Sequence, residues 1–198
     1  MKDVYIGKEA LSEDQQLVEQ ALAGKTESFG QLVRKYQDRL FNTLVHVTGS
    51  THEAEEVAQD AMMQAYAKLH TFRGSSSFYT WLYRIAFNMS VSRRRKERVR
   101  VSLDQLHEHA GVDPPDNAER PDAVIERTER AEQVHAALGK LSEEFRTILV
   151  LREIDDCDYD TISEMLNVPI GTVRSRLHRA RSILRDHLRQ AIGDLSGT

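Results

Sequence analysis

The fold is decided by one stretch of the chain, Asp160-Thr161-Ile162-Ser163-Glu164-Met165-Leu166-Asn167-Val168-Pro169-Ile170-Gly171-Thr172-Val173. Its first half has the apolar spacing of a short amphipathic helix, carried by Ile162, Met165 and Leu166. Asn167 is suited to a positive φ, and Pro169 and Gly171 prepare the start of another helix. This order predicts a helix-turn-helix.

The second helix of this motif has two chemically different sides. The packed side is apolar at helical spacing and comprises Val173, Leu177, Ala180 and Leu184. We predict that the other side contacts DNA through Thr172, Arg174, Ser175, His178 and Arg179. Arginine matches guanine and phosphate, and short hydroxyl side chains let a helix enter the major groove. Arg176 lies nearer the packed side, where it would cover apolar surface or touch phosphate. The alternative is a surface helix whose arginines are only solvated.

The rest of the chain also has helical periodicity and almost no strand signal, so we expect an all-α protein. We expect helices at about 14–23 and 27–48, and a third that opens with a Ser50 and Glu53 capping box and carries an apolar stripe to Leu69. Another helix follows the polar loop 72–77 and ends in a basic cluster, and Leu141-Ser142-Glu143-Glu144 marks a later start.

The composition divides the chain into two helical domains. A chain of 198 residues is long enough for two such domains. We expect a tail at 1–13, a domain at 14–100, a flexible acidic linker with prolines at 101–122, and a second domain at 123–198. The formal net charge is -4, but residues 84–100 and 171–189 are strongly basic and 101–133 strongly acidic. Two separated basic patches favour two anchor points on one polyanion.

Two motifs carry a family resemblance. The segment Phe72-Arg73-Gly74-Ser75-Ser76-Ser77-Phe78-Tyr79-Thr80-Trp81-Leu82-Tyr83-Arg84-Ile85-Ala86-Phe87-Asn88 closely resembles the promoter-melting segment of extracytoplasmic-function sigma factors of the sigma-E type. Residues 169–181 resemble the minus-35 reader of the same family. The resemblance implies a dissociable specificity subunit of bacterial RNA polymerase, with sigma-2 and sigma-4 domains and no catalytic centre. It also implies three partners, which are core polymerase, promoter DNA and an anti-sigma protein.

Holding an unpaired minus-10 strand requires a base pocket and cations for phosphates. In relatives, positions matching Phe72 and Asn88 help to form that pocket. The expected minus-10 residues are Phe72, Arg73, Ser75, Ser76, Tyr79, Asn88, Arg93, Arg94, Arg95 and Lys96. The spacing places Trp81 on the packed stripe and leaves Tyr79 and Tyr83 off it as stacking candidates.

The resemblance also implies that the helix at 51–70 docks on the largest polymerase subunit and that the C-terminal domain meets the flap of the second-largest subunit. The polar residues off its apolar stripe are the docking candidates, namely Glu55, Glu56, Gln59, Asp60 and Gln64. The alternative is a solvated acidic face.

Other chemistries find little support. The one cysteine, Cys157, excludes an internal disulfide, and neighbouring aspartates disfavour its thiolate. His107 and His109, with Asp104 and Glu108, make a poor metal site because they lie in a flexible linker. The sequence contains no enzyme motif, and we expect no bound metal or cofactor. No apolar run is long enough to span a membrane and the N-terminus lacks an apolar signal region, so a cytoplasmic protein is expected. A free-standing helix-turn-helix regulator and a helical interaction protein without DNA contact remain the rival hypotheses.

Overall fold

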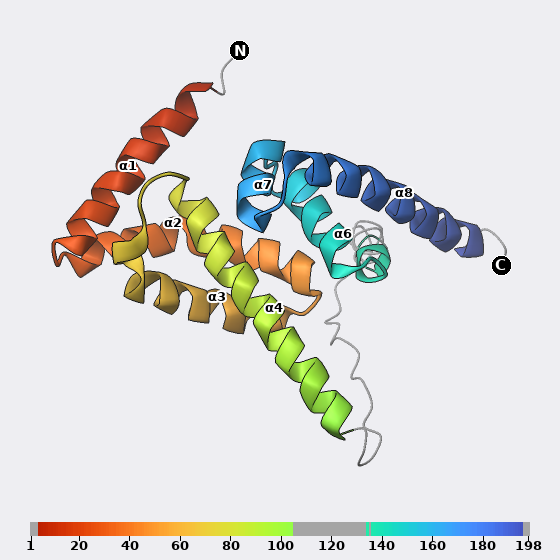
Figure 1. Cartoon of the computed structure of the whole chain (residues 1–198). Helices are drawn as coiled ribbons and strands as arrows, with labels where there is room; N and C mark the ends of the chain where they lie inside the picture. Colours follow the sequence, from red (N-terminus) through yellow and green to blue (C-terminus); the bar gives the residue numbers. More distant parts are fainter. Residues whose placement is uncertain (1–3, 105–133, 135, 196–198) are drawn as a thin grey trace, which may run out of the picture. The chain divides into compact units, whose positions relative to one another are not determined.

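The computed structural model describes residues 4–104, 134 and 136–195, and the side chains of residues 13–95, 134 and 136–190. The described residues are helical or form short connections, and no strand occurs among them (Figure 1). The predicted all-α class is confirmed. The chain divides into two compact units, one of Met1–Leu44 and His52–Arg100 and one of Val45–Thr51 and Val101–Thr198.

The first unit is a helical bundle. It contains α1 (Val4–Leu22), the short 3-10 helix η1 (Leu69–Thr71) and most of α2 (Thr26–Thr48), α3 (Thr51–Ala67) and α4 (Phe78–Asp104). The predicted end of α2 is confirmed, because Gly49 follows it with a φ of 77° that favours glycine. The bundle core consists of fully buried apolar side chains, among them Leu32, Leu40, Leu44, Val57, Phe78 and Leu82.

Two helices are longer than the sequence pattern indicates. The first begins at Val4 rather than near residue 14, and α4 continues to Asp104, four residues beyond the basic cluster. Residues 4–13 contain no proline, and residues 101–104 contain neither glycine nor proline, so nothing in the backbone stops either helix.

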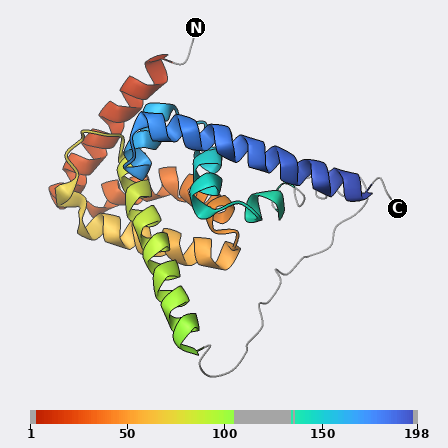
Figure 2. The same ribbon diagram turned by 45° about the vertical axis from the view of Figure 1, so that its right-hand side comes forward.

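The second unit is built around the helix-turn-helix. Its elements are α6 (Glu143–Leu149), the π-helical segment η2 (Val150–Ile154), α7 (Tyr159–Leu166) and α8 (Ile170–Leu195), which Figure 2 shows from a second direction. The predicted start at 141–144 is confirmed, since Ser142 is extended and α6 begins at the next residue. The core combines buried side chains from these elements, among them Ile148, Leu151, Ile162, Val173 and Leu177.

Candidate nucleic-acid and protein interfaces

The turn between α7 and α8 has the geometry that the sequence predicts. Asn167 adopts a left-handed conformation with a φ of 53°. The N–H of Val168 donates to the Ser163 carbonyl at 3.1 Å, and the Ser163 hydroxyl donates to the Val168 carbonyl at 2.6 Å. The carbonyl of Pro169 then accepts from the N–H of Thr172 at 2.8 Å in the first turn of α8. These bonds fix the angle at which α8 leaves the turn.

The two sides of α8 differ as predicted. Val173, Leu177 and Ala180 are buried, whereas Leu184, which was also predicted on the packed side, is half-buried. The candidate DNA residues lie on the other side, where Arg174, Ser175, His178 and Arg179 are exposed and Thr172 is half-buried. The helix therefore presents hydrogen-bonding groups to solvent while its apolar side completes the core.

Four of the six arginines of α8 fall into two groups. Arg176 pairs with Glu144 of α6 at 3.0 Å, and Arg181 pairs with Glu153 of η2 at 2.7 Å. Over the described part of the chain, Arg174 and Arg179 have no ion-pair partner. The first group holds α8 to the unit, and the second remains available to an external anion.

Asp158 caps the N-terminus of α7. Its Oδ1 accepts from the backbone N–H of Thr161 at 2.7 Å, and this bond lowers the pKa of the Asp158 carboxyl from its ordinary value. The cap satisfies a donor that the helix cannot satisfy itself. It sets the start of the helix that supports α8.

We expect Asp158→Ala to lower the free energy of unfolding by about 1 kcal/mol at pH 7. Because the pKa of the folded state is lowered, this stabilisation is present above the unfolded-state pKa of about 4 and is lost as pH falls through the folded value. Urea denaturation at pH 7 and at a pH below the folded-state pKa of Asp158 measures the loss of stability. Hydrogen exchange in α7 shows whether the loss lies in that helix. Asp160→Ala removes an exposed charge of the same helix turn and serves as control; an equal loss in both variants contradicts the capping role.

The loop at 72–77 connects η1 to α4 and has a defined shape. Gly74 has a φ of 68°, a backbone conformation that residues with a side chain rarely adopt. The Ser77 hydroxyl accepts from the N–H of Thr80 at 3.0 Å and caps α4. The half-buried Phe72 packs on Trp81, with ring centroids 5.4 Å apart. Of the other predicted residues here, Arg73, Ser75 and Asn88 are exposed and Ser76 is half-buried.

The expected packing of the aromatic residues of α4 was wrong. Tyr79 and Tyr83 are buried, whereas Trp81 is only half-buried. Tyr79 fits inside because its hydroxyl is 3.1 Å from the Thr43 hydroxyl, and the Arg39 guanidinium lies 4.1 Å from its ring centroid. Tyr79 is therefore a core residue in this structure and presents no face to a nucleic-acid base.

The basic run of α4 is partly paired within the first unit. Arg93 contacts Glu56 at 2.9 Å and Arg94 contacts Glu53 at 3.1 Å, which ties α4 to α3. Arg95 is exposed. The side chain of Lys96 lies outside the described residues. Glu56, a predicted docking residue, therefore already forms an ion pair with Arg93 of α4.

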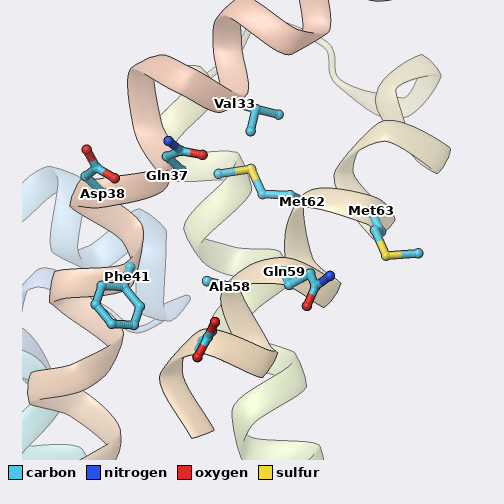
Figure 3. Close-up of a pocket in the computed structure, with 9 residues that line it drawn as sticks. Val33, Gln37, Asp38, Phe41, Ala58, Gln59, Met62 and Met63 are labelled. Carbon is cyan, nitrogen blue, oxygen red and sulfur yellow. The ribbon is translucent and has the colours of Figure 1, made fainter. Parts of the chain in front are cut away.

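The surface of α3 contains a groove that the sequence did not indicate. Of the predicted docking residues, Glu55, Gln59 and Asp60 are exposed and Gln64 is half-buried. Beside them α2 and α3 enclose a hollow of about 400 Å³, shown in Figure 3. Its apolar lining comprises Val33, Phe41, Ala58, Met62 and Met63, and its polar lining comprises Gln37, Asp38, Glu55 and Gln59. Met63 is a sign of the groove that the sequence contains, because it is a large apolar side chain of α3 that lies off the buried stripe.

Both units match known protein families. Residues 32–100 match sigma-70 region 2, and residues 131–184 match sigma-70 region 4. The RNA polymerase sigma-H factor of Pseudomonas aeruginosa is 39% identical over 87% of this chain and 92% of its own length. The extracytoplasmic-function (ECF) sigma factor SigW of Bacillus subtilis is 35% identical over 87% and 95%. The chain belongs to the extracytoplasmic-function sigma factors.

Solved structures agree with this family. The sigma factor RpoE of Bartonella quintana, in complex with the anti-sigma factor NepR, has a TM-score of 0.66 at 25% identity over 82% of this sigma factor and 98% of that chain. CnrH, in complex with the cytosolic domain of CnrY, has a TM-score of 0.67 at 25% identity over 90% and 98%. Helix α1 precedes the residues that match region 2.

The described part of this sigma factor contains no group of three metal-ligating side chains. Residues His107, Glu108 and His109 lie outside it. Among the described helices none is long and apolar enough to cross a membrane. Cys157 is buried, and its thiol lies 3.8 Å from the Asp155 carbonyl.

Proposed function

We propose that this sigma factor binds core RNA polymerase and directs promoter-specific initiation through three separate surfaces. The observation that carries the proposal is the exposed face of α8, where Arg174 and Arg179 lie without ion-pair partners within the described residues. A helix held by a helix-turn-helix with free arginines on its outer side fits the major groove. The protein acts as a regulatory initiation factor in the cytoplasm, where polymerase works.

The α8 surface reads the minus-35 element. Arg174 and Arg179 supply guanidinium groups for guanine or phosphate, and Thr172 and Ser175 are short enough for close approach. The hydroxyl of Ser175 donates to the Thr172 carbonyl at 3.1 Å, so it lies against the helix and leaves room for a base edge. His178 adds a donor and acceptor that helps to set the preferred sequence.

The loop surface holds the minus-10 strand. Phe72 offers a ring fixed by Trp81, Arg73 and Arg95 offer cations, and Asn88 offers an amide for a base edge. Backbone and hydroxyl groups at Ser75 and Ser76 complete the set.

The α3 surface docks on polymerase. It combines the acids Glu55 and Asp60 and the amides Gln59 and Gln64 with the apolar groove next to them (Figure 3). Apolar area at the centre with a polar rim is the usual composition of a protein interface. One solved neighbour is a complex with the anti-sigma factor NepR, and the other is a complex with the cytosolic domain of CnrY. We propose that an anti-sigma partner covers this same surface here.

Run-off transcription from genomic promoters with core polymerase tests the proposal. We expect specific transcripts only when this protein and core enzyme are both present. A free-standing regulator would instead bind duplex DNA without polymerase and would start no transcript. A helical interaction protein would do neither.

We expect Phe72→Ala and Asn88→Ala to slow strand opening by roughly tenfold, since base stacking contributes about 1 to 3 kcal/mol per base. Duplex binding through α8 should be unchanged because these residues belong to the other unit. Permanganate footprinting of unpaired thymines measures the opening. Asn42→Ala, an exposed amide of α2, serves as control; footprints like wild type in all three variants would rule out the pocket.

A further inference from the structure

The loop at 72–77 is supported from behind by α1. An ideal Cβ on Gly74 would lie 3.0 Å from Gln15 Nε2, so the side chain of Gln15 reaches the loop backbone. The η1 turn that leads into the loop also contacts α1. The end of the Gln15 side chain therefore lies against the loop backbone at Gly74, and this contact joins α1 to the loop.

Helix α1 is itself fixed by a buried carboxylate. Asp14 is 3% exposed, and its two oxygens accept from Lys35 Nζ at 2.7 Å and from the Tyr36 hydroxyl. A buried carboxylate is costly unless its oxygens are satisfied, so these bonds specify one placement of α1 on α2. Burial and the bond to Asp14 raise the pKa of Tyr36, which keeps its hydroxyl a donor.

The ring of Tyr36 continues this contact toward the loop. Its centroid lies 5.8 Å from that of Phe78 and 5.6 Å from that of Tyr79, the first two residues of α4. Phe78 in turn packs on Phe72, with centroids 5.8 Å apart. Tyr36 therefore joins Asp14 of α1 to the aromatic residues on which Phe72 rests.

We propose that α1 is a positioning element for minus-10 strand binding, with Asp14 acting through Tyr36 and Gln15 acting on Gly74. This inference rests on the proposed function of the loop. It assigns a role in promoter opening to a helix that precedes the residues matching region 2. None of these side chains needs to touch DNA, because they determine where Phe72 and the loop backbone lie.

Two matched pairs of variants test the inference in the full chain bound to core polymerase. Tyr36→Phe removes only the hydroxyl that joins Asp14 to the aromatic residues, whereas Tyr66→Phe removes the hydroxyl of an exposed tyrosine on α3. Gln15→Ala removes the contact at Gly74, whereas Gln16→Ala changes an exposed neighbour. The probe is a single-stranded oligonucleotide with the minus-10 sequence of a promoter identified by run-off transcription, and its affinity is measured by anisotropy.

We expect Tyr36→Phe and Gln15→Ala to weaken oligonucleotide binding by about two- to thirtyfold, the range of coupling found along packed networks. Tyr66→Phe and Gln16→Ala should bind within about twofold of wild type, because neither side chain contacts the loop or Asp14. Wild-type binding by Tyr36→Phe and Gln15→Ala overturns the inference. So does a loss in all variants that follows their melting temperatures.

The same assay separates this inference from the proposed function. Phe72→Ala should reduce binding of the oligonucleotide if the loop reads the strand. If Phe72→Ala has no effect, the proposed role of the loop fails. If it has an effect and the α1 variants have none, only the role of α1 fails.

Discussion

Replacing Arg174 and Arg179 together by alanine is expected to reduce promoter-specific transcription by roughly thirtyfold or more, because each groove contact is worth about 1 to 3 kcal/mol. Both side chains are exposed on α8 and neither is an element of the unit's core. The helix should remain folded, since its packing depends on Val173, Leu177 and Ala180. Run-off transcription and core binding, measured side by side, give the two quantities.

Arg185→Ala is the matched control for this pair. It removes the same charge from an exposed position on the same helix, beyond the predicted contacts. We expect transcription within about twofold of wild type for this control. An arginine that contacts a base should relax sequence preference when replaced, whereas one that contacts phosphate should lower the salt dependence of binding. Equal losses in Arg185→Ala and the double variant would mean that α8 acts through general charge alone.

The helix-turn-helix could be predicted from the sequence because its determinants are local. Asn167, Pro169 and the spacing of Val173 and Leu177 lie within one short segment, and the structure places each as expected. A turn residue and an apolar stripe need no distant partner to be recognised. The same is true of the ends of α2 and the start of α6.

The orientation of α4 could not be predicted in the same way. Two apolar stripes fit the sequence of α4, and Phe78, Leu82 and Ala86 belong to both. Residue type favours the stripe that also includes Trp81 over the stripe that also includes Tyr79. The structure buries Tyr79 instead, since its hydroxyl finds the Thr43 hydroxyl, 36 residues earlier in the chain. A buried polar tip is acceptable only with such a partner, and that partner is set by tertiary packing.

The groove and the ion pairs of the first unit also depend on tertiary packing. The apolar spacing of α2 and α3 predicts a core, but it does not reveal that Phe41 and Val33 remain only half-buried beside Met62. Likewise the pair between Arg94 and Glu53 joins residues 41 positions apart. The family resemblance implied a polar docking face on α3, and the structure adds an apolar groove beside it to that hypothesis.

The apolar groove leads to the second large expected effect. We expect Met63→Asp to weaken binding to core polymerase by about thirtyfold, because central interface residues often contribute 2 kcal/mol or more. Met63 is 67% exposed at the groove, so the added carboxylate remains solvated in the free protein and should not disturb folding. On docking, the same carboxylate would lose its water against an apolar partner surface. Titration of labelled protein with core enzyme measures the affinity.

Leu22→Asp provides the control for the chemistry of this change. Leu22 is also an exposed large apolar residue, at 51%, but it lies at the end of α1 and does not line the groove. The same type of substitution there should leave core affinity within about twofold of wild type. If both variants bind core polymerase normally, docking depends on the acids of α3 alone and the groove is not part of the interface. If only Met63→Asp loses affinity for core polymerase, an apolar side chain of polymerase enters the groove between α2 and α3. A purely polar contact would tolerate an added carboxylate at such an exposed position.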